Sequence, residues 1–188
     1  MLFMNSKDFL AKQLGETAQI IDWAIKLVPE TRLLEIHPAK DHPKADEFMK
    51  RYFGSWSAYR ILFHLVIYEE VFALPALKHW LGGPLPRKDK VPKEEELWNE
   101  ELQRGIYLKA LLKRFHAVRK EQIEALNQMS EATWKEVKDG TFWGKVSAEF
   151  SVSKTIQHSF EHGNKIMRLG LFWDRLLAWL DQLEKLES

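Results

Sequence analysis

Cysteine is absent from this chain of 188 residues. Its absence excludes disulfides, a thiolate nucleophile, and zinc or iron-sulfur sites built on cysteine. An excess of charge of one sign is lacking too, because 28 Lys and Arg residues balance 27 Asp and Glu residues. A net charge of +1 creates no field that attracts nucleic acid or an anionic membrane. We therefore expect neither of those partners. The substrate that we expect is a small molecule.

Long hydrophobic runs are also missing, since no segment approaches ~18 uncharged apolar residues. The first residues, MLFMNSKDFLAKQ, do not follow the signal-peptide pattern, and we expect a cytoplasmic protein. Glycine (9) and proline (7) are few, while charged residues make up 29% of the chain, which is typical of helices. With 45% hydrophobic residues, the chain is long enough for one domain over residues 1–188.

The spacing of apolar residues predicts an all-α protein. Predicted helices cover residues 6–28, residues 55–80, and residues 93–129 with a break near Gly105. Pro75 should kink the second helix or divide off a short final segment. A fourth helix runs from a Ser151 or Ser153 cap to residue 173, and Asp174 either begins a last helix or lies within one continuous helix. Residues 30–50 contain Pro38 and Pro43, which favours a long connection. Residues 131–150 are expected to form a loop with a short helical turn, without strands. The expected fold is an antiparallel four-helix bundle with an additional or extended C-terminal helix.

Three histidines stand out as candidate metal ligands. His64 lies in the apolar stretch ILFHLVIY, where its ring nitrogens need partners. His158 and His162 are four residues apart, so on a helix they project from one face and can reach the same ion. Bundles build metal sites from side chains on facing helices. Because metal must be held by His, Asp or Glu here, His64, His158 and His162 form the predicted site.

Each of these histidines also has an ordinary structural interpretation. A core histidine such as His64 more often bonds a carbonyl or a Tyr hydroxyl, and an HxxxH pair can simply be a polar helix face. Tyr68, one turn after His64, and Glu161, about 60° around the helix from His158, are candidates for proton transfer or for supporting the ligands. His37 and His42 are expected to be solvated in the proline-containing loop and His116 to be exposed, while Trp173 and Trp179 suggest a dimer surface.

Two motifs resemble those of the DinB/YfiT-like family, which is regarded as a metalloenzyme family. SWSAYRILFHLVIYEE and TIQHSFEHGNKIMRL match its Trp about two turns before a His, and its HxxxH pair followed by an Ile. The matching residues are Trp56, His64, His158, His162 and Ile166. The similarity covers most of the chain in the order of elements, although the 30–50 connection and the long C-terminal helix fit less closely.

The resemblance implies an up-down-down-up four-helix bundle, often dimeric, that binds one divalent metal, commonly zinc or nickel, through three histidines. Some relatives are thiol-dependent S-transferases or isomerases that use low-molecular-weight thiols such as bacillithiol, mycothiol or glutathione. The leading hypothesis is thus a metal-dependent transferase or hydrolase. The alternatives are a noncatalytic bundle that binds a metal or ligand, and an interaction protein whose histidines bind no metal.

Overall fold

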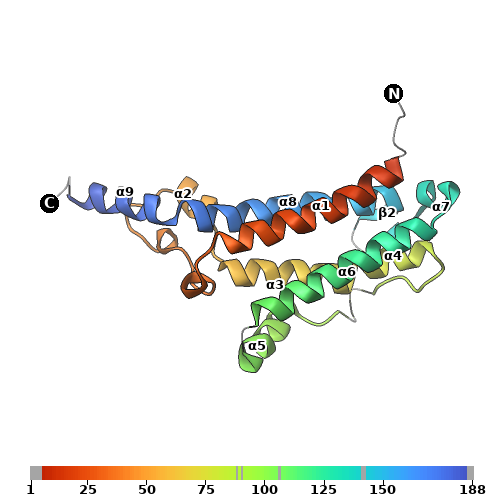
Figure 1. Ribbon diagram of the computed structural model, residues 1–188, viewed down its shortest axis with the longest axis horizontal. Coiled ribbons are helices and arrows are strands. Elements are labelled where there is room, and N and C mark those ends of the chain that lie inside the picture. Colours follow the sequence, from red (N-terminus) through yellow and green to blue (C-terminus); the bar gives the residue numbers. More distant parts are fainter. Residues whose placement is uncertain (1–5, 88, 90, 106, 141–142, 186–188) are drawn as a thin grey trace. The chain divides into compact units, whose positions relative to one another are not determined.

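A computed structural model describes residues 6–87, 89, 91–105, 107–140 and 143–185. The chain divides into two compact units, and Figure 1 shows their helices and strands. Unit 1 comprises Met1–Gln19 and Phe63–Phe160, and unit 2 comprises Ile20–Leu62 and Glu161–Ser188. Three uninterrupted helices contribute residues to both units: α1 (Ser6–Lys26), α3 (Ala58–Tyr68) and α8 (Ala148–Leu171).

Unit 1 is a helical bundle with a small hairpin. Its remaining elements are a π-helical turn (Glu69–Ala73), α4 (Leu74–Trp80), α5 (Glu94–Arg104), α6 (Leu108–Gln128), α7 (Glu131–Lys135), β1 (Val137–Gly140) and β2 (Gly144–Ser147). Its core joins Leu14 of α1, Leu77 of α4, Leu126 of α6 and Val152 of α8. Within this unit, α1 and α8 run in one direction while α3–α4 and α6 run in the other (Figure 1). The predicted all-α fold with up-down-down-up order is therefore confirmed.

The second predicted helix is interrupted by the π-helical turn that joins α3 to α4. Pro75 is in the first turn of α4 and has no N–H to donate to the preceding turn. A wider turn accommodates that missing hydrogen bond without breaking the helix. The short final segment expected at Pro75 is thus α4, and the turn that separates it, Glu69–Ala73, comes immediately after the helical segment that carries His64 and Tyr68.

Unit 2 contains a helix that the sequence analysis missed. Its elements besides the shared helices are two 3₁₀ turns (Glu30–Arg32 and Pro38–Lys40), α2 (Glu47–Phe53) and α9 (Trp173–Lys185). The Asp46 side chain caps α2 by accepting a hydrogen bond from the Met49 N–H, and Gly54 ends it at a φ of 74°, which a residue with a Cβ rarely adopts. Met49 packs with Leu180 in a small core. The additional C-terminal helix is confirmed as α9.

Two further expectations about the loops and caps were wrong. Residues 131–150 contain the expected short helical turn, α7, but they also include the β1–β2 hairpin, in which Val137 pairs with Ser147 and Gly140 with Gly144. Neither four-residue strand has a buried residue, and the sequences VKDG and GKVS show no alternation of apolar and polar residues that would have predicted strands. The fourth helix starts at Ala148 rather than after Ser151 or Ser153, and the Ser147 hydroxyl accepts from the Phe150 N–H. Among the described residues, none of the helices is long and apolar enough to cross a bilayer.

Candidate metal site

His64 lies on α3 with buried apolar neighbours on both sides. Phe63 and Leu65 are 1% and 0% exposed, whereas 18% of the His64 side chain remains exposed. The imidazole is thus partly accessible while the backbone around it is fixed by packing. An apolar setting also strengthens any electrostatic interaction that the ring makes.

The Nδ1 atom of His64 is hydrogen-bonded to a carboxylate. Glu94, the first residue of α5, places its Oε2 atom 2.7 Å from His64 Nδ1. Trp98, one turn further along α5, packs its ring 5.3 Å from that of Phe63, and this contact holds the start of α5 beside α3. Because a carboxylate only accepts hydrogen bonds, Nδ1 of His64 donates, and in the neutral ring Nε2 then presents its lone pair.

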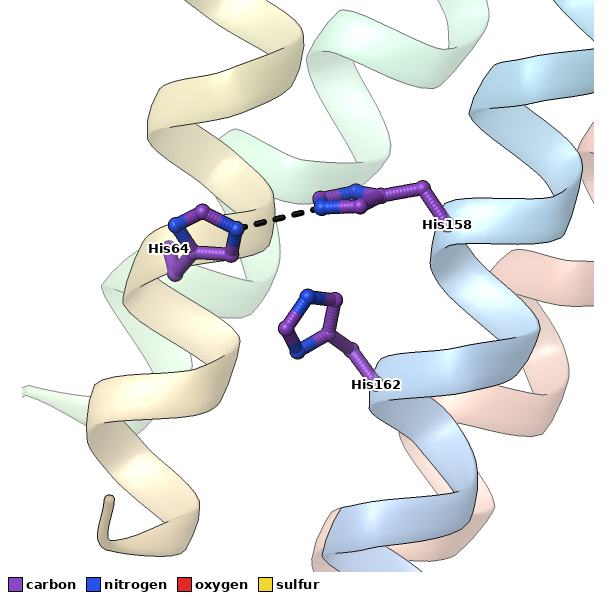
Figure 2. A group of neighbouring side chains, drawn as sticks. All are labelled: His64, His158 and His162. Atoms are coloured by element: carbon purple, nitrogen blue, oxygen red, sulfur yellow. Dashed lines mark hydrogen bonds between the residues drawn. The ribbon is translucent and has the colours of Figure 1, made fainter. Parts of the chain in front are cut away.

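That lone pair faces a second imidazole. The Nε2 atoms of His64 and His158 are 3.1 Å apart, and His162 follows His158 by one turn of the continuous helix α8. The nitrogen atoms that the three histidines can offer as ligands all lie within 4.8 Å of one another (Figure 2). The three residues singled out in the sequence therefore form one cluster.

The donor set fits a divalent transition metal. Three imidazole nitrogens suit zinc, nickel, copper or iron. With metal-nitrogen bonds of ~2.1 Å, a tetrahedral ion separates its nitrogen ligands by about 3.4 Å, close to the 3.1 Å between His64 and His158. The carboxylate on the outer nitrogen of His64 is the partner that metal-ligating histidines commonly have. Without an ion, His158 must carry a proton on Nε2 to bond His64.

Two aromatic rings pack against the histidines of α8. The Tyr68 ring centroid is 4.2 Å from that of His158, and burial raises the pKa of the Tyr68 hydroxyl, which hydrogen-bonds Thr155. In unit 2, the Trp56 ring lies nearly parallel to that of His162, at 14° and 6.2 Å between centroids. These contacts restrict how the two imidazoles can turn. Tyr68 consequently keeps its proton at neutral pH beside a candidate ligand.

Sequence reasoning missed Glu94. It begins the EEEL stretch after Pro92, which resembles any acidic first turn of a helix, and only the packing of α5 against α3 distinguishes it from its neighbours. Glu161, which was favoured instead, is exposed on α8, and its proposed role stays a prediction. In contrast, His116 is exposed as expected.

His37 was expected to be solvated, but it is buried. It is 1% exposed, stacks on Phe53 at 3.9 Å between ring centroids and meets the edge of the Trp173 ring. Trp173 itself is buried, so of the two tryptophans suggested for a dimer surface only Trp179 is exposed. The 37–46 connection is further held by His42, whose Nε2 lies 3.1 Å from a Glu184 oxygen.

A buried charged cluster adjoins Tyr68 and His158. Arg119, 2% exposed, donates to Glu69 and to the hydroxyl of Ser159, and Gln122 donates to the other Glu69 oxygen. Glu69 follows Tyr68 in the chain and Ser159 follows His158. The cluster therefore links the backbone beside Tyr68 to the backbone beside His158 through one guanidinium.

Comparison with known proteins agrees with this arrangement. A model of the DinB superfamily matches residues 13–166, a range that includes the three histidines and Trp56. No curated protein and no solved structure matches the chain. Because the match covers well over half of the sequence, the chain belongs to the DinB superfamily.

Proposed function

We propose that this protein is a metal-dependent enzyme that binds one divalent cation, zinc or nickel, through His64, His158 and His162. The proposal rests on the two contacts that the His64 ring makes. Its Nδ1 atom is 2.7 Å from Glu94 Oε2, and its Nε2 atom is 3.1 Å from His158 Nε2. The first fixes the proton on the outer nitrogen, and the second directs the inner lone pair toward a neighbouring imidazole. Family membership supports the same assignment.

The reaction we propose is a transfer to or from a low-molecular-weight thiol. A divalent cation with open positions lowers the pKa of a bound thiol or water and makes it a nucleophile at neutral pH. The chain supplies a carboxylate that orients His64, and a Tyr68 hydroxyl that stays protonated because burial raises its pKa. Tyr68 can therefore donate a hydrogen bond to a substrate oxygen or to a departing group. Glu161 is a second, exposed candidate for proton transfer.

Metal content tests the proposal. Protein purified without a nickel column is analysed for zinc, nickel, copper and iron, and its affinity for zinc and nickel is then titrated. We expect about one ion per chain. We also expect Glu94→Gln to weaken metal affinity by roughly 10–100-fold, the usual effect of removing a group that orients a ligand.

The matched control is Glu96→Gln, on the same turn of α5, where Glu96 pairs with the exposed Lys93 at 3.5 Å. It should leave metal affinity unchanged. Failure of the wild-type protein to bind any of these ions would contradict the proposal. The result would then favour a bundle in which His158 simply donates to His64.

A noncatalytic metal-binding bundle is the alternative. The coordination shell separates the two, because a structural site is closed by a fourth protein ligand whereas a catalytic site keeps an exchangeable position. X-ray absorption spectroscopy of the metal-loaded protein with and without a thiol, followed by activity screening with thiols and electrophiles, distinguishes them. A change of the metal's ligand set on thiol addition supports the enzyme.

A further inference from the structure

A pocket lies in unit 2, between α2 and α9. It has a volume of ≈ 280 Å³, the space of about nine water molecules at roughly 30 Å³ each. Five aromatic side chains and one arginine line most of it: Phe48, Tyr52, Phe53, Phe172, Trp179 and Arg175. Figure 1 shows α2 lying beside α9. None of these residues is a candidate metal ligand, so the pocket is independent of the histidine cluster.

One side of the pocket is formed by buried residues, and the opposite rim is exposed. Phe53 is 3% exposed and Met49 packs into the small core with Leu180, so the floor is part of a packed interior. The upper rim is exposed, with Phe48 at 72% and Trp179 at 40%. Such a concave aromatic surface, preformed by packing, is typical of sites for small apolar ligands.

Arg175 is the positively charged residue in the lining of this pocket. It forms no hydrogen bond or ion pair with any other residue of the described chain. Two of the carboxylates of α9 are engaged elsewhere: Asp174 pairs with Arg32 at 2.9 Å and Glu184 with His42 at 3.1 Å. Arg168 is also engaged, since it donates to the Tyr52 carbonyl and lies over the Tyr52 ring. The pocket therefore presents one cation with free donors beside an apolar wall.

This combination selects the chemistry of the occupant. A neutral apolar ligand or a second apolar protein surface would cover Arg175 without pairing it, and removing a charge from water without a partner is costly. A ligand with one carboxylate avoids that cost, because a guanidinium binds a carboxylate with two parallel hydrogen bonds. Aromatic walls meanwhile favour an alkyl or aryl body. We propose that the α2–α9 pocket binds a small amphipathic carboxylate, with Arg175 pairing the acid group.

The test uses octanoate as the probe and octanol as its uncharged match, with binding to the full chain measured by calorimetry. We expect saturable octanoate binding that Arg175→Gln weakens by about three- to tenfold, as for a partly exposed ion pair. Octanol should bind more weakly than octanoate to the wild-type protein. Its affinity for Arg175→Gln should equal its affinity for the wild type, because octanol has no acid group to pair with the arginine. Trp179→Ala should weaken both ligands, because it removes part of the wall.

The matched control is Arg51→Gln, on the same helix as Phe48 but outside the pocket lining, which should leave octanoate binding unchanged. Three results would overturn the proposal: no saturable binding up to about 10 mM, octanol binding as tightly as octanoate, or equal losses in the two arginine variants. Sedimentation equilibrium provides a fourth. A dimer that Phe48→Glu dissociates would show that a second copy of the chain covers the pocket.

Discussion

Replacing Arg119 by leucine tests the buried charged cluster behind the histidines. In the native fold, Arg119 is 2% exposed and donates to Glu69, Ser159, Thr17 and the Leu14 carbonyl. Its removal leaves a fully buried carboxyl without a cation. Breaking one partner of a buried pair typically costs about 3–5 kcal/mol, a large share of the roughly 5–15 kcal/mol that stabilises a domain. We expect Arg119→Leu to lose that amount at about pH 8.

The cost should depend on pH in a defined direction. Burial raises the pKa of Glu69 to about 7, although Arg119 acts to lower it. A carboxyl whose pKa is raised by folding contributes stability below its unfolded pKa of roughly 4.5 and loses it as pH rises through the folded value. Without Arg119 that folded pKa rises further. Arg119→Leu should therefore cost clearly less at about pH 5, where Glu69 is protonated, than at about pH 8.

Urea unfolding followed by far-UV circular dichroism at both pH values measures these costs. Arg119→Leu, Glu69→Gln and the double variant complete a double-mutant cycle, which should show coupling above about 1 kcal/mol because the two side chains are in contact. Arg104→Gln, which removes an exposed pair with Glu100, is the control and should cost less than about 1 kcal/mol. An Arg119→Leu cost below that level, or one independent of pH, would refute the reasoning.

Three further predictions concern unit 2 and the helices. Gly170→Ala should destabilise the fold by about 1–3 kcal/mol, because a Cβ would lie 2.7 Å from Leu27 Cβ. Gly15→Ala, with its nearest contact at 3.9 Å, should instead stabilise the fold by about 0.5–1 kcal/mol. Thermal unfolding of both variants checks the contrast. Burial lowers the pKa of His37, so its contribution to stability should be lost as pH falls below about 6.5, and His37→Gln should flatten that slope in unfolding titrations. Asp46→Ala should cost about 1 kcal/mol by removing the α2 cap, and an unchanged denaturation midpoint would contradict this.

The clustering of His64, His158 and His162 could be predicted from the sequence because the spacing of residues along a helix determines the directions of their side chains. Residues four apart, such as His158 and His162, must project from one face of α8, and a histidine in an apolar helix needs a partner wherever the helix packs. The neighbouring carboxylate could not be predicted in this way. Glu94 reaches His64 from 30 positions away, and tertiary contacts such as that of Trp98 with Phe63 hold α5 in that place.

Short elements escaped prediction for a different reason. Helix α2 has seven residues, too few to show a clear apolar period, and it is stabilised by the Asp46 cap and by Met49 packing against α9. His37 likewise lies in a polar, proline-containing stretch, yet it is buried because Phe53 and Trp173 enclose its ring. In both cases one of the contacts comes from α9, over 100 residues later in the chain: Leu180 packs with Met49, and Trp173 meets the His37 ring.

The π-helical turn at Glu69–Ala73 sets the rotational phase of the segment that follows it. One residue corresponds to ~100° around an α-helix, so deleting a single residue there would leave His64 and Tyr68 in place while rotating α4 by about that angle. Leu77 and Trp80, both in the core of unit 1, would then turn away from α6 and α8. The length of this one turn thus lets a single continuous helix place His64 and Tyr68 at the histidine cluster before the turn and Leu77 and Trp80 in the core after it.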